Sequence, residues 1–110
     1  MPEVKRSPKP QLLFEENVDK FNELVAAGKI PDLSNQNLSD LDLRNFHLTH
    51  ANLSGAYLRG ANLKGLDLSG ANLNGASIKN ASISGCLFPK GLQACEIQMS
   101  YEHGTRMRQL

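Results

Sequence analysis

The chain has 110 residues, of which 40% are hydrophobic and 5% aromatic, and its formal net charge is +1. This length fits one domain, and the near-neutral charge and absence of tryptophan give no sign of binding to nucleic acid or to an anionic membrane. No apolar run reaches the roughly 18 to 20 residues that cross a bilayer, and no secretory leader is evident, so we expect a cytoplasmic monomer or small oligomer.

The first thirty residues divide into a tail and a helix. Residues 1–10 combine three prolines with charged side chains and predict a disordered tail. Residues 11–30 predict a capping helix from about Leu13 to Ala27, since Gly28 is a typical helix end and Pro31 prevents continuation. Its apolar stripe, which we expect to cover the open end of the next segment, consists of Phe14, Val18, Phe21, Leu24 and Val25.

Residues 31–90 carry an apolar residue at every fifth position, a period that fits neither a helix nor a strand and therefore indicates a repeat. The residue two positions before each centre is mostly small and apolar. The residue two positions after it is mostly Gly, Asn or Asp, which tolerate positive φ in turns. The centres are Leu33, Leu38, Leu43, Leu48, Leu53, Leu58, Leu63, Leu68, Leu73, Ile78, Ile83 and Phe88.

Units such as Ala51-Asn52-Leu53-Ser54-Gly55 and Ala71-Asn72-Leu73-Asn74-Gly75 resemble the pentapeptide-repeat family. The resemblance implies an all-β solenoid, a right-handed quadrilateral parallel β-helix with four units to the coil and about three coils. The centre and the residue two before it would point inward. Residues 20 apart would then lie above one another, which places Phe46, Leu66 and Cys86 in one inward column.

Residues 91–110 follow the break at Pro89 and Gly91, and Ala94 to His103 predicts a short helix ending at Gly104. The last part of this segment, with Gly-Thr-Arg-Met-Arg at residues 104–108, resembles a C-terminal cap of cyanobacterial pentapeptide-repeat proteins. We expect it to close the last coil. Cys86 and Cys95 lack CxxC spacing and predict free thiols.

Candidates for chemistry are few. His47, His50 and Asp67 are weak candidates for a metal or enzymatic site, because the 20-residue register places Asp67 beside His47 one coil up. No fourth ligand is evident, so a surface His and Asp pair is the favoured interpretation. The serines that follow the repeat centres are merely compatible with the turn, and none has a histidine poised beside it, so we predict no enzyme activity, no metal and no cofactor.

Basic side chains form two neighbouring columns in the expected stack. Arg44 and Lys64 share one column, and Arg59 and Lys79 share the next. We name these four as candidate partner-binding residues, with a merely solvated surface as the alternative.

The sequence therefore predicts a non-enzymatic module that presents a rigid surface to a protein partner, with regulation as one use. One branch of the family that this chain resembles mimics duplex DNA and binds DNA gyrase. A DNA mimic needs a continuous acidic face, whereas residues 31–90 mix acidic and basic side chains. That alternative is disfavoured for this reason.

Overall fold

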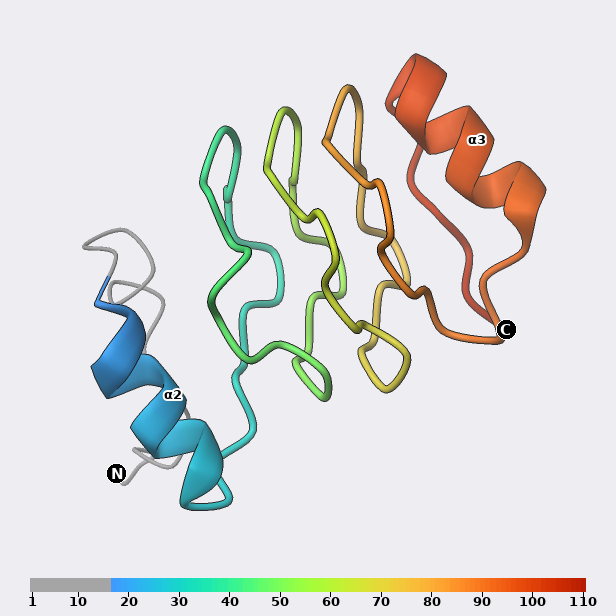
Figure 1. Cartoon of the computed structure of the whole chain (residues 1–110). Helices are drawn as coiled ribbons and strands as arrows, with labels where there is room; N and C mark the ends of the chain where they lie inside the picture. The colour runs from blue at the N-terminus through green and yellow to red at the C-terminus, as the bar shows by residue number, and fades with distance from the viewer. Residues whose placement is uncertain (1–16) are drawn as a thin grey trace.

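The computed structural model describes residues 17–110, in which two helices lie at opposite ends of a stack of coils (Figure 1). Helix α2 spans Val18–Ala26 and helix α3 spans Ala94–His103. The predicted tail at residues 1–10, and the part of the N-terminal helix expected before residue 17, lie outside the described residues.

Helix α2 begins and ends with local hydrogen bonds. The Asn17 side chain accepts a hydrogen bond from the Lys20 N–H at 3.3 Å and caps the first turn. At the other end Gly28 has a φ of +93°, and its N–H donates to the Val25 carbonyl at 2.9 Å. The stop predicted at Gly28 is therefore present, one residue beyond the cap at Ala27.

The buried side of α2 packs on the first coil, as the apolar stripe predicts. Phe21 is fully buried, and its ring meets the Phe46 ring edge to face with centroids 5.1 Å apart. Helix α2 thus covers the part of this end of the apolar interior that lies beside Phe46.

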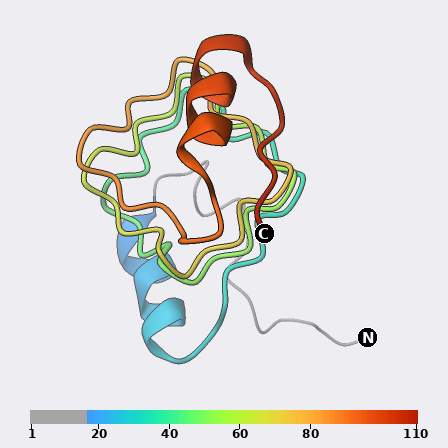
Figure 2. The ribbon, with the colours of Figure 1, turned by 90° about the vertical axis from the view of Figure 1, so that its right-hand side faces the viewer.

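The coils repeat every 20 residues, so four five-residue units make one coil. The Asn52 N–H donates to the Pro31 carbonyl and the Leu33 N–H donates to the Asn52 carbonyl, both at 2.8 Å. Seen along the axis, the coils superimpose (Figure 2). The parallel bridges that set this register are Asp32–Asn52, Asn37–Tyr57, Asp42–Asn62, Asn52–Asn72, Tyr57–Ser77, Asn62–Ser82 and Asp67–Leu87.

These bridges are isolated, and residues 17–110 contain no continuous strand. The structure differs in this respect from the all-β solenoid that the sequence predicts. The physical reason is the short unit. Each bridged residue is followed within two positions by a turn, so a single residue per unit pairs with its neighbour coil. The predicted 20-residue register of parallel pairing is confirmed.

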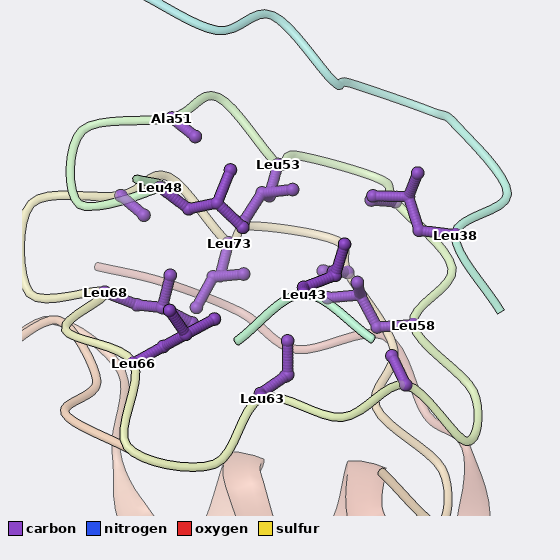
Figure 3. Close-up of a cluster of buried hydrophobic side chains, with 14 of the residues drawn as sticks. Leu38, Leu43, Leu48, Ala51, Leu53, Leu58, Leu63, Leu66, Leu68 and Leu73 are labelled. Carbon is purple, nitrogen blue, oxygen red and sulfur yellow. The ribbon is translucent and has the colours of Figure 1, made fainter. Parts of the chain in front are cut away.

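The interior is filled by the repeat centres (Figure 3). The centres from Leu33 to Ile78 are at most 1% exposed, and the alanines two positions before them are also buried. Ile83 and Phe88, in the last coil, are partly buried and pack against the core. The predicted inward positions are therefore inward.

One face departs from the common pattern. Within residues 17–110 no bridge joins His47 to Asp67, although Asp67 pairs with Leu87 above it. We attribute the gap to two large side chains, Phe46 and Leu66, that are stacked in this inward column, whereas the second-coil residue of each other inward column is alanine. The His47 N–H donates instead to the Asn22 side chain of α2, at 2.8 Å.

The C-terminal segment closes part of the last coil. The Met107 N–H donates to the Ala76 carbonyl, and the Gly75 N–H donates to the Met107 carbonyl. The Gln109 side chain accepts from the Leu73 N–H at 2.7 Å, and the Ser100 hydroxyl accepts from the Ile78 N–H at 3.0 Å. Helix α3 has the bounds expected from the sequence and lies across the opening of the coil (Figure 2).

Candidate functional site

An open groove of about 520 Å³ runs along the face built from the second unit of each coil. Residues 36–40, 56–60 and 76–80 lie above one another there, because Asn37, Tyr57 and Ser77 are bridged in succession. The end of α3 reaches the same face. We call this the Tyr57 groove, and it is lined by Asn37, Ser39, Tyr57, Arg59, Ser77, Lys79, His103 and Gly104.

The floor of the Tyr57 groove is made of short polar side chains. The Asn37 side-chain oxygen accepts from the Ser39 N–H at 3.1 Å and from the Ser39 hydroxyl at 2.6 Å, which fixes both residues on the turn. Ser77 is nearly buried, whereas Tyr57 is 40% exposed. The tyrosine ring is therefore the large surface that a ligand would meet.

Arg106 holds Tyr57 in place from the C-terminal segment. Its guanidinium carbon lies 5.0 Å from the centroid of the Tyr57 ring, and one guanidinium nitrogen donates to the Gly75 carbonyl at 3.1 Å. A second nitrogen donates to the Tyr57 hydroxyl. Because the hydroxyl oxygen accepts from Arg106, its own proton is available to donate to a ligand.

Lys79 joins the coil to the end of α3. Its ammonium donates to the Glu102 carbonyl at 2.9 Å. Its stem packs beside Gly104, where a Cβ would lie 3.3 Å from the Lys79 side chain. Gly104 ends the helix with a φ of +74°. The charge of Lys79 is therefore positioned at the rim of the Tyr57 groove.

Arg59 extends from the second coil into the same groove. Within residues 17–110 its guanidinium takes part in neither an ion pair nor a side-chain hydrogen bond. Arg59 and Lys79 therefore keep hydrogen-bonding capacity on one face, as their shared column predicts.

The other two basic candidates lie apart from this groove. Arg44 forms an ion pair with Asp42 at 2.7 Å, and this guanidinium lowers the pKa of the Asp42 carboxyl to about 2. Lys64 is exposed on the third unit of its coil, and its backbone N–H donates to the Asn62 side chain. The Arg44 charge is compensated, so the four candidates do not make one continuous basic surface.

The three weak metal candidates do not form a ligand set. Asp67 accepts from the Ser69 N–H at 3.0 Å, and its pKa is lowered first by its hydrogen bonds with Ser69 and then by the nearby charge of His50. The His50 ring packs over Gly70 one coil up. Within residues 17–110 no group of three His, Cys, Asp or Glu side chains is placed to hold a metal ion.

Sequence reasoning missed Tyr57, His103 and Arg106 as parts of one site. Tyr57 could have been noticed, because the residue before each repeat centre is otherwise Asn, Asp, Ser or His, with Leu87 as the other large apolar residue. Arg106 could not have been, because its place beside Tyr57 depends on how the C-terminal segment folds back, 49 positions along the chain.

Comparison with known families agrees with this architecture. The model for pentapeptide repeats matches residues 32–65 and 51–88 with eight copies, and together these matches span 57 of the 110 residues. Among the curated proteins no match is found. In the described part of the chain, neither helix is long and apolar enough to cross a membrane. The five-residue spacing, the 20-residue register and this match establish that the chain belongs to the pentapeptide-repeat family.

Proposed function

We propose that this chain is a non-enzymatic, cytoplasmic protein-binding module that contacts its partner through the Tyr57 groove. Its coils would form the right-handed quadrilateral β-helix that family membership implies. The family fits a protein-interaction role, because its members present the rigid outer faces of a repeat.

The groove itself is the observation that carries the proposal. It spans successive coils, and α3 and the C-terminal segment hold Tyr57 and Lys79 by named contacts. A site whose side chains are already fixed loses little conformational entropy when a partner binds. Tyrosine and arginine are also the residue types enriched at the centres of protein interfaces.

The test is affinity capture with three baits: the unchanged chain and two variants, Arg59→Glu and Lys64→Glu, each of which changes one exposed residue. Both substitutions change the charge by two units at the same place in the repeat, but on different faces. A partner that binds the groove is captured by the unchanged chain and by Lys64→Glu, and is lost with Arg59→Glu. Direct binding of that protein, after purification, to the same three chains completes the test.

Capture that responds to Lys64→Glu and not to Arg59→Glu would contradict the choice of face. Capture that responds to neither substitution would contradict a groove interface altogether.

A further inference from the structure

We propose that the Tyr57 groove binds an extended acidic segment of the partner, whose carboxylates face Arg59 and Lys79. This inference rests on the proposed function and names the chemistry of the ligand.

The charges around the Tyr57 groove favour an anionic ligand. Arg59 from the second coil and Lys79 from the third coil line it, and no acidic residue is among the residues that line it. The acidic groups close to it are Glu102, which lies 3.8 Å from His103, and Asp40, whose carboxylate packs at Gly60. Neither of these carboxylates lines the groove, so the permanent charges on its walls are positive.

The two candidate anchors have donors to spare. The Lys79 ammonium has three N–H donors, and one of them is used by the Glu102 carbonyl. The Arg59 guanidinium presents a planar fork that matches a carboxylate, and no group among residues 17–110 occupies it.

The shape of the groove suits an extended chain. It crosses successive coils, which stack at about 4.8 Å, and alternate side chains of an extended peptide are about 6.8 Å apart. The long stems of arginine and lysine can take up this difference of about 2 Å. The short floor residues Asn37 and Ser77 leave room for a peptide backbone, and the Tyr57 hydroxyl can donate to one of its carbonyls. Two carboxylates on one side of such a peptide would face the two neighbouring basic residues.

A nucleic acid fits the same groove less well. Tyr57 is the one aromatic residue among those that line it, so successive bases would lack a stacking surface. The Asp42 partner of Arg44 also interrupts any longer basic track around the coil.

The experiment is an NMR titration of the ¹⁵N-labelled full chain with a blocked peptide of about ten residues in which Glu and Ser alternate. It is run at about 0.15 M ionic strength, where interactions between charges more than about 8 Å apart are largely screened. We expect amide shifts concentrated at residues 37–39, 57–60 and 77–80. Arg59→Gln is expected to weaken binding about fivefold, the upper range for one exposed ion pair. Lys64→Gln, the matched control, leaves the affinity unchanged within about twofold, since Lys64 lies on another face.

Three results would overturn the inference: no shifts at the groove, equal loss of binding with Lys64→Gln, or equal binding of a peptide in which Lys replaces Glu. Inorganic phosphate or a single-stranded oligonucleotide that binds the groove as tightly as the peptide would replace it with a simple anion site or a nucleic-acid site. If Arg59→Glu abolishes partner capture while the acidic peptide does not bind, the ligand class is wrong and the protein-binding role stands. If partner capture is also independent of Arg59, both the acidic ligand and the proposed protein-binding role of the groove are wrong.

Discussion

At the scale of single residues, the turns show how one coil constrains the next. Asn35 and Asp40 adopt positive φ in the first coil, and their side chains occupy the space where a Cβ of Gly55 or Gly60 in the second coil would lie. A Cβ on Gly60 would lie closer to the Asp40 carboxylate than van der Waals contact allows. Glycine is thus needed there both for its φ of +69° and for space.

We expect Gly60→Ala to destabilise the fold more than Gly65→Ala. Both glycines have positive φ, which costs an alanine about 1 to 2 kcal/mol. A Cβ at Gly65 meets nothing within 4 Å, whereas Asp40 must rotate away from a Cβ at Gly60, at about 1 kcal/mol more. Urea denaturation of the two variants measures the difference, and adding Asp40→Gly to Gly60→Ala should remove it. Equal costs in the two variants would contradict the stacking of Asp40 on Gly60.

The two cysteines should react very differently, although both are free thiols. Burial, followed by the nearby charge of Asp67, raises the pKa of Cys86 to about 11, so about one thiol in a thousand is a thiolate at pH 8. Cys95 is exposed on α3. Iodoacetamide at pH 8 should therefore label Cys95 first and Cys86 only slowly, as followed by mass spectrometry. Equal rates would mean that Cys86 is not in the inward column.

At the scale of elements, the C-terminal segment was the more predictable of the two ends. Helix α3 has its expected bounds because Pro89 and Gly91 break the repeat and Gly104 supplies a left-handed helix end. The contacts that attach it could not be predicted, because they join side chains such as Ser100 and Gln109 to backbone groups of the last coil. Serine and glutamine are common at exposed positions, so neither residue type indicates a contact with the last coil.

One ion pair ties α3 to the end of the chain. Glu96 accepts from the Arg108 backbone N–H at 3.1 Å and from its guanidinium at 2.7 and 3.0 Å. These hydrogen bonds hold the pKa of Glu96 below its ordinary value of 4.5. A carboxyl with a lowered pKa in the folded state stabilises the fold above its unfolded pKa, and this contribution is lost as the pH falls through the folded value.

Glu96→Gln should therefore lower the melting temperature at pH 7, and the difference from the unchanged chain should shrink as the pH falls below about 4.5. Glu102→Gln on the same helix is the matched control, because its carboxylate contacts Gln98 and His103 rather than an arginine. Melting curves from pH 3 to 7 measure both effects. A Glu96→Gln difference that stays constant with pH would show that the carboxylate charge contributes nothing.

At the scale of the whole molecule, the repeat could be predicted well and the groove could not. The five-residue pattern identified the repeat, and the resemblance to the pentapeptide-repeat family implied four units per coil and therefore the 20-residue register that the bridges confirm. The missing pairing of His47 with Asp67 was not predicted, because it depends on the volumes of Phe46 and Leu66. Only Arg59 and Lys79 of the groove could be predicted, because His103, which lines it, and Arg106, which contacts Tyr57, come from outside the repeat.

Hydrogen–deuterium exchange of the chain, alone and in complex with the captured partner, tests the central claim most directly. The account predicts slower exchange on binding at residues 37–39, 57–60 and 77–80 and around His103 to Arg106, which surround the Tyr57 groove. Exchange at residues 42–44 and 62–64, on the face of Arg44 and Lys64, should not change. Protection confined to that face, or to the ends of the stack, would contradict the account.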